Sequence, residues 1–214
     1  MRSLSPKRRI MAVDPSLTCS GWALFGVVPD RPGQGSLLAV GKIRSLSPQH
    51  ALAARFKDLQ EKISMVCEEL KLCGNDVLIC ESQTTMRDPR AAFKVEQVRG
   101  IFETVARSRS LSVPGRINPR TVQSEIMGLR GKQLARDIVK DTALHIVKTV
   151  YGPSLEALGF PADHENLSRN QDIVDAILIG SLALTRFGTA AMGGLELEET
   201  LLPRARRVGK RLPR

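Results

Sequence analysis

Four carboxylates stand where elements of secondary structure are expected to end or begin. Asp14 and Glu81 each follow directly on a short apolar run, and Asp172 and Asp175 lie three residues apart at the start of a long apolar segment. Carboxylate oxygens are hard ligands that suit Mg²⁺, with Mn²⁺ as a substitute, better than zinc. Two such ions about 4 Å apart can activate water and stabilise the leaving oxygen of a phosphodiester. The pattern favours a metal-dependent nuclease.

Asp175 is the most informative of these residues. Residues three apart in a helix lie on one face, and Asp175 is surrounded in sequence by apolar residues from Ile173 to Ile179. A carboxylate buried there without a partner costs several kcal/mol, so we expect a metal ion or a basic residue beside it. Asp172 can serve as a helix N-cap or first-turn residue without any function. An exposed or ion-paired Asp175 without a catalytic role is the structural alternative.

The hydrophobic pattern predicts an α/β fold with a mixed five-stranded sheet. Three strands with short connections favour an antiparallel meander, and the later strands alternate with helices. The predicted order is strands 10–13, 21–28 and 37–43, helix 50–72, strand 76–80, helix 89–107, strand 111–117, and helices 119–127, 132–150 and 171–187. Residues 151–170 are expected to be loop. Because sheets of this type gather ligand groups outside their strand ends, Asp14 and Glu81 could meet.

Composition sets the class of protein. The 214 residues are 42% hydrophobic, enough for a core, so we expect one domain over residues 9–187 and a linker with a basic tail over 188–214. No apolar run approaches the ~20 uninterrupted residues that span a bilayer, and the N-terminus lacks a secretory signal. We therefore expect a cytoplasmic protein without membrane contact, although the arginine-bearing N-terminus leaves an organellar address open. The four cysteines lack C-x-x-C spacing and are expected to be reduced thiols.

The net charge of +10 is concentrated in a few segments. Residues 1–9 contain four basic and no acidic residues, and residues 204–214 contain six basic and none acidic. Residues 86–136 add eleven basic against four acidic residues. Nucleic acid is the partner expected for such a pattern, although basic tails that only confer solubility remain an alternative. The candidate DNA contacts are Arg87, Arg90, Lys94, Arg99, Arg120, Arg130, Lys132 and Arg136.

Five ordered segments resemble one family, and together they cover about residues 9–187. They are IMAVDPSLTCSGW, VLICESQ, AAFKVEQVRGI, NPRTVQSEIMG and QDIVDAIL. The chain resembles the RuvC type of Holliday-junction resolvase, in the ribonuclease-H-like superfamily. The resemblance implies a homodimeric endonuclease that binds four-way DNA junctions and nicks two strands symmetrically with divalent metal ions.

The resemblance also implies roles for particular residues. Asp14, Glu81, Asp172 and Asp175 match the family's four acidic metal ligands. Lys132 falls near the place of a basic residue close to the scissile phosphate. The helix over 89–107 is the one through which the family dimerises, and its apolar stripe of Ala92, Val95, Val98 and Phe102 is either dimer contact or core.

The sequence departs from the family in one loop and leaves other functions open. The stretch after Glu81 has no aromatic residue where the bacterial enzymes have one, and Gln123 stands where relatives often carry lysine. The same carboxylates would also suit a ribonuclease-H-like nuclease for RNA–DNA hybrids or other branched DNA. A non-catalytic junction-binding protein is a further alternative. An actin-like ATPase is disfavoured because the sequence lacks a second glycine-rich phosphate segment, so no nucleotide cofactor is expected.

Overall fold

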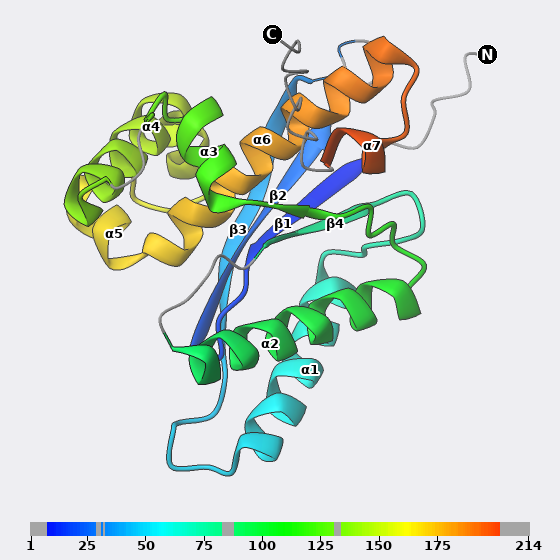
Figure 1. Cartoon of the computed structure of the whole chain (residues 1–214), viewed down its shortest axis with the longest axis vertical. Helices are drawn as coiled ribbons and strands as arrows, with labels where there is room; N and C mark the ends of the chain where they lie inside the picture. The colour runs from blue at the N-terminus through cyan, green and yellow to red at the C-terminus, as the bar shows by residue number, and fades with distance from the viewer. Residues whose placement is uncertain (1–7, 29–30, 32, 83–87, 131–133, 202–214) are drawn as a thin grey trace, which may run out of the picture.

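A five-stranded sheet forms the centre of the molecule (Figure 1). The computed structural model describes residues 8–28, 31, 33–82, 88–130 and 134–201. The strand order is β3-β2-β1-β4-β5, in which β1, β4 and β5 are parallel and β2 is antiparallel to both β1 and β3. The strands are β1 (Arg9–Asp14), β2 (Cys19–Val27), β3 (Gly35–Arg44), β4 (Val77–Glu81) and β5 (Arg116–Ile117).

The two central parallel strands are buried on both faces. All residues from Ile10 to Val13 and from Val77 to Cys80 are buried, as the uninterrupted apolar runs predict. In the parallel pairing, Val13 lies beside Cys80. The residues that follow, Asp14 and Glu81, therefore reach the same edge of the sheet.

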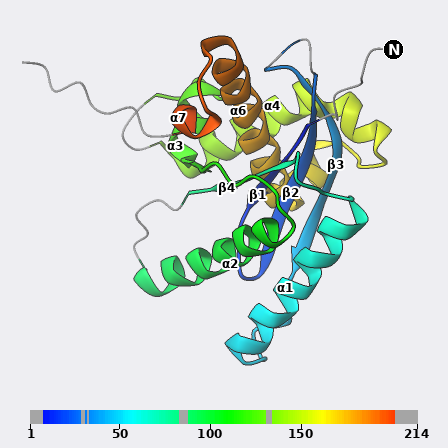
Figure 2. The ribbon, with the colours of Figure 1, turned by 90° about the vertical axis from the view of Figure 1, so that its right-hand side faces the viewer.

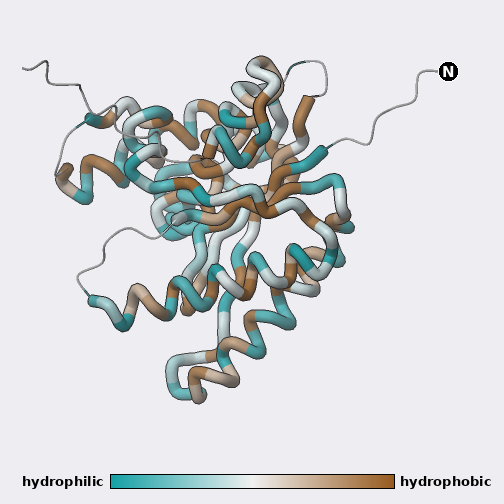
Figure 3. Tube along the Cα trace, turned by 45° about the vertical axis from the view of Figure 1, so that its right-hand side comes forward, coloured by the Kyte–Doolittle hydropathy of each residue, from teal (hydrophilic) through white to brown (hydrophobic). Residues whose placement is uncertain are grey.

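Helices cover both faces of the sheet (Figures 1 and 2). Residues Met11, Val13 and Leu78 pack with α1 and α2, whereas Ile10, Ala12 and Val77 pack with α6 and its neighbours. Figure 3 shows the hydrophobic residues gathered on the strands and on the helix surfaces that meet them. The helices are α1 (Leu52–Glu69), α2 (Pro89–Ser108), α3 (Pro119–Glu125), α4 (Arg136–Ala157), α5 (His164–Arg169), α6 (Gln171–Gly193) and α7 (Leu197–Leu201).

The predicted α/β class and the order of the elements are confirmed, but residues 151–170 differ from the expected loop. Helix α4 continues to Ala157 with Pro153 inside it, and α5 follows. Leu155 and Leu167 are fully buried, so burial of two leucines outweighs the polar composition of the segment. The expected strand 111–117 is reduced to two residues plus one bridge at Ser112, since Pro114 interrupts the pairing.

The folded part also continues beyond the expected boundary at residue 187. Helix α6 extends to Gly193, where Gly194 adopts the left-handed conformation that ends many helices. Helix α7 then packs back through Leu197, which is buried. Within the described part of the chain, α6 is long and apolar enough to cross a membrane, but 67% of the relevant window is buried inside the fold. It is a core helix of this domain.

Candidate functional site

Asp14 and Glu81 meet at the carboxyl ends of β1 and β4. Side chains alternate along a strand, so Asp14 shares the face of Ala12, and Glu81 shares the face of Ile79. That face is the one covered by α6. The two carboxyl groups lie close enough that each affects the pKa of the other.

The start of α6 brings the other two acidic residues to the same place. Gly21 of β2 pairs with Asp14, and a Cβ built on Gly21 would lie 1.9 Å from the backbone oxygen of Asp172. Only glycine allows this approach of helix to strand. Farther along α6, Gly180 has the same relation to Phe25, with 2.1 Å from its built Cβ to the ring. The two glycines seat α6 on β2, and Asp172 and Asp175 therefore lie beside Asp14.

Burial and neighbouring charges raise the pKa values of the carboxyl groups in this cluster. Burial, followed by the charges of Glu81 and Asp175, raises the pKa of Asp14 well above its usual value. Burial and the charge of Asp175 raise the pKa of Glu81 to about 7, although the hydrogen bond with Asp14 works in the opposite direction. Buried carboxyl groups with raised pKa values that lie together are typical of a functional site.

Asp175 has two partners within the fold. Gln171 donates from Nε2 to Asp175 Oδ1 at 3.0 Å. Burial raises the pKa of Asp175 to about 6, and the Gln171 hydrogen bond opposes that rise; the charge of Asp172 adds to it and the charge of Lys140 opposes it. Lys140 projects from α4. The sequence prediction of a basic partner for Asp175 thus has a candidate in Lys140, which no local pattern identifies.

Asp172 lies at the margin of the cluster. Its Oδ2 is 3.6 Å from Lys42 Nζ, and its side chain is 34% exposed. Burial and then the neighbouring Asp172 carboxylate raise the pKa of the Cys19 thiol. Among the groups that raise the pKa of Asp14, Asp172 has the smallest effect. Asp14, Glu81 and Asp175 therefore form the inner group, and Asp172 is engaged by a lysine.

The donor set fits a hard divalent cation in its chemistry. Asp14, Glu81 and Asp175 offer only oxygen atoms, and their pKa values are raised by burial first and by the charges of neighbouring carboxylates second. As these side chains stand, no three His, Cys, Asp or Glu residues of the described segments are near enough to form a complete metal site. A bound cation would have to draw these carboxylates together.

The match to known proteins identifies the family. Residues 10–151, well over half of the chain, match the sequence profile of the family described as crossover junction endodeoxyribonuclease RuvC. The chain belongs to the RuvC family. The resemblance predicted from the five sequence segments is thereby confirmed. The matched range contains Asp14 and Glu81, whereas Asp172 and Asp175 lie beyond it.

Solved structures of RuvC and other resolvases share the fold. Thermus thermophilus RuvC in complex with Holliday junction substrate matches with a TM-score of 0.60 and 22% identity, over 86% of this chain and 96% of that chain. The yeast mitochondrial Holliday junction resolvase Ydc2 matches with a TM-score of 0.56 and 13% identity, over 94% and 87%. The Fowlpox virus resolvase with its junction DNA matches with a TM-score of 0.51 and 16% identity, over 82% and 96%. No curated protein sequence matched the chain.

RuvC-like nucleases depend on divalent metal ions. In this chain, exposed basic residues flank the carboxylates. In Figure 1 the first turn of α2 lies on one side of the carboxyl end of β4, and α3 and α4 lie on the other. Exposed basic residues occupy both sides, with Arg120 also interacting inside the fold. They are Arg90 and Lys94 on α2, Arg120 on α3, and Arg130 and Arg136 at the approach to α4. The predicted contacts Arg87 and Lys132 lie outside the described residues.

Arg99 differs from the sequence expectation. Its side chain is only 5% exposed and lies against Glu96 and Glu103. Glu103 is also buried and accepts from Arg116 at 2.8 Å and from Arg107 at 3.3 Å. Arg99 therefore belongs to an internal ion-pair network, and we leave it out of the DNA-contacting set.

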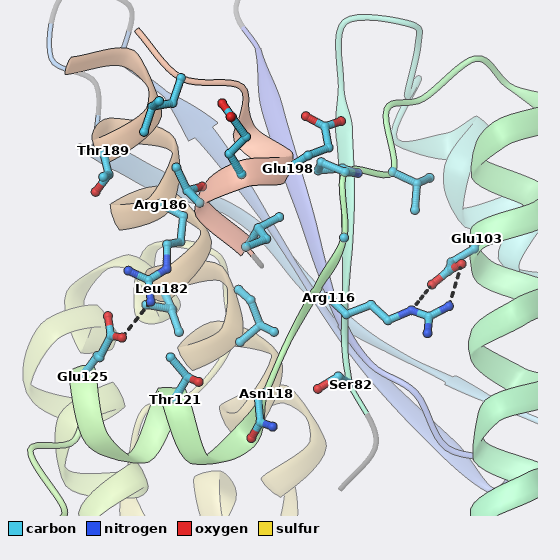
Figure 4. A pocket seen from close by; sticks show the side chains of 18 of the residues that line it. Ser82, Glu103, Arg116, Asn118, Thr121, Glu125, Leu182, Arg186, Thr189 and Glu198 are labelled. Carbon is cyan, nitrogen blue, oxygen red and sulfur yellow. Dashed lines mark hydrogen bonds and ion pairs between the residues drawn. The ribbon is translucent and has the colours of Figure 1, made fainter. Parts of the chain in front are cut away.

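A cleft of about 830 Å³ begins at Ser82, the residue after Glu81, and runs along β5 toward α7 (Figure 4). Arg116 and Glu103 stand on one wall, and Arg186 pairs with Glu125 at 2.7 Å on the other. Asp14, Glu81, Asp172 and Asp175 do not line it. Four glutamates and three arginines line the cleft, so it is a weaker candidate for a polyanion than the exposed basic residues that flank the carboxylates.

Proposed function

We propose that this RuvC-family protein resolves four-way DNA junctions by hydrolysing one phosphodiester in each of two strands. Asp14, Glu81 and Asp175 would be the first Mg²⁺ ligands, and Asp172 would complete a site for a second ion, with Mn²⁺ able to substitute. The observation that carries the proposal is the convergence of three partly buried carboxyl groups from two strands and one helix at a single edge of the sheet. Family membership gives the reaction its substrate class.

The residues of the chain have distinct roles in this mechanism. Bound divalent ions supply an activated water and stabilise the leaving oxygen. Asp14 and Glu81 must both be deprotonated to act as ligands, and burial raises the pKa of each of them. Gln171 orients Asp175 through its hydrogen bond. Lys132, outside the described residues, stays a prediction as the basic residue near the scissile phosphate.

We also propose that the exposed basic residues on α2, α3 and α4 contact the DNA backbone on both sides of the carboxylates. Backbone contacts position a duplex without reading its sequence, and their contribution falls steeply with salt. The basic residues of the two termini would add affinity in the same way. A DNA-acting enzyme of this kind belongs in a compartment that contains DNA, and we place it in the cytoplasm.

Two symmetric nicks require two active sites related by a dimer axis, so we propose a homodimer. The stripe predicted as a dimer contact does not serve as a whole, because Val98 and Phe102 are buried in the chain's own core. Another part of α2 is available. Phe93 is 65% exposed, and a Cβ built on Gly100 meets nothing within 4 Å. These two positions are seven residues apart and thus share a helix face.

The alternative functions have less support. An enzyme for RNA–DNA hybrids could use the same carboxylates, but the family match favours junction DNA. A non-catalytic junction binder would have no need for three converging buried carboxyl groups, since each is costly without a cation.

The test is cleavage of synthetic substrates by the protein and its Asp175→Asn variant. A synthetic immobile four-way junction, a linear duplex and an RNA–DNA hybrid are incubated with and without Mg²⁺, and binding is followed by gel shift. We expect Mg²⁺-dependent nicking of the junction by the unmodified protein, and retained binding without nicking by the variant. Glu165→Gln, which alters a carboxylate that is 72% exposed on α5, is the control. Nicking by Asp175→Asn at the unmodified rate would remove the proposed metal site.

A further inference from the structure

Lys42 reaches the acidic cluster from the edge of the sheet. Its Nζ lies 3.6 Å from Asp172 Oδ2 and donates to the backbone oxygen of Arg169 at 3.3 Å. Only 14% of the Lys42 side chain is exposed. A lysine with its stem covered and its ammonium group on a carboxylate is held in one place, unlike a solvated surface lysine.

The strand register explains why Lys42 stands there. Gly21 of β2 pairs with Asp14 on one side and with Lys42 of β3 on the other. Because Gly21 has no side chain, the first turn of α6 rests on it, and Lys42 is the next residue across the sheet on the same face. The ammonium group thus contacts both the turn before α6 and the first carboxylate of α6.

We propose that Lys42 is a positioning residue that occupies Asp172 and makes binding of a second divalent cation conditional on its own displacement. This inference rests on the proposed function, since it concerns the same metal site. A first cation can use Asp14, Glu81 and Asp175 without disturbing Lys42. A second cation needs Asp172, and the ammonium group of Lys42 already neutralises that carboxylate.

The direction in which removal of the Lys42 charge changes metal affinity distinguishes this role from simple anchoring of α6. If Lys42 competes with a cation, replacing it with a neutral residue frees Asp172 and strengthens weak metal binding. If Lys42 only anchors the start of α6, the same replacement loosens Asp172 and weakens metal binding. A partly exposed ion pair is worth about fivefold in a binding constant, which corresponds to ~1 kcal/mol.

The experiment measures Mn²⁺ binding to the full-length chain without DNA, from the electron paramagnetic resonance signal of free Mn²⁺. We expect one tight and one weaker class of site, and a weaker class strengthened about fivefold by Lys42→Met. Lys42→Arg retains the charge and should behave as the unmodified protein. Lys62→Met is the matched control, since Lys62 makes comparable contacts to Asp58 Oδ2 at 2.8 Å and to a β3 carbonyl at 2.9 Å.

A double-mutant cycle ties the effect to the ion pair. In an Asp172→Asn background, Lys42→Met should no longer strengthen the weaker class. Thermal melts of each variant show whether the fold is retained. Unchanged or weaker Mn²⁺ binding by a folded Lys42→Met variant would overturn the role of Lys42 alone. Absence of any Mn²⁺ binding by the unmodified protein would instead overturn the metal site itself.

Discussion

Replacing Glu81 by glutamine should stabilise the metal-free protein at pH 8. Burial and the charge of Asp175 raise the pKa of Glu81 from its usual 4.5 to about 7. Between these two values the folded chain keeps a proton that the unfolded chain has lost. The free energy of unfolding therefore falls as pH rises through this window, and the full loss is reached above about pH 7. Glutamine does not titrate, so the variant avoids that loss.

The size of the gain follows from the shift. A displacement of 2.5 pKa units, at ~1.4 kcal/mol per unit, limits the effect to about 3 kcal/mol. The titrations of Asp14 and Glu81 are linked, so we expect only part of this limit, roughly 1–2 kcal/mol, as net stabilisation. At pH 4 both proteins are neutral at this position, and the difference should vanish.

Urea unfolding in the presence of EDTA tests this prediction. A gain of ~2 kcal/mol moves the unfolding midpoint by about 1 M urea when the denaturant slope is ~2 kcal/mol per M. Millimolar Mg²⁺ should make the unmodified protein the more stable of the two. Binding of the ion stabilises the unmodified protein, whereas the variant lacks the Glu81 carboxylate that would coordinate it. Lower stability of Glu81→Gln at pH 8 without metal would show that Glu81 is already compensated inside the fold.

A buried carboxylate with a full set of partners provides the contrast. Asp76 is 1% exposed, pairs with Arg9 at 2.6 Å and accepts from the backbone of Cys73. Asp76→Asn should destabilise the protein by about 3 kcal/mol at pH 8, because it leaves Arg9 without its charge partner. Opposite signs for Glu81 and Asp76 would show that the effect comes from the site and not from burial alone.

Three further substitutions test the packing of α6 on β2, the ion pairs of Glu103 and the proposed dimer contact of α2. Gly21→Ala forces the backbone of Asp172 to move, so Mg²⁺-dependent nicking should fall at least about 100-fold in a cleavage assay while junction binding persists. Glu103→Gln should lower the melting temperature at pH 7 but have little effect near pH 3. Burial would raise the pKa of Glu103, but Arg116 outweighs burial and holds that pKa below its usual value. The stability that the ionised Glu103 adds is therefore lost as pH falls. Phe93→Asp should halve the mass seen by light scattering if that face of α2 joins two chains.

For each of these three variants, a specific result would contradict the prediction. Gly152→Ala introduces a Cβ that meets its nearest neighbour at an ordinary 3.8 Å, so it should retain nicking, and an equal loss there would point to general instability. A melting temperature of Glu103→Gln that tracks the unmodified protein at both pH values would mean that the arginines are held by other contacts. An unchanged mass for Phe93→Asp would move the dimer contact elsewhere.

The amino-acid sequence alone predicts the fold class and singles out the acidic residues. The short apolar runs at 10–13 and 76–80 favour buried central strands, and a carboxylate that follows such a strand stands at an edge of the sheet. This pattern predicts Asp14 and Glu81, the helical spacing of Asp172 and Asp175 among apolar residues predicts the other two, and the five segments predict the family. These features depend on local periodicity and on neighbours in the chain, which a sequence displays directly.

The tertiary structure is needed to see that Asp14, Glu81 and Asp175 form an inner group while Asp172 pairs with Lys42. The seating of α6 on Gly21, the capture of Asp172 by Lys42 and the approach of Lys140 to Asp175 join residues more than thirty positions apart. Such contacts depend on strand order and helix packing, and no periodicity in the chain encodes them. For the same reason Arg99, which reads as an exposed DNA contact in sequence, is buried against Glu103 in the fold.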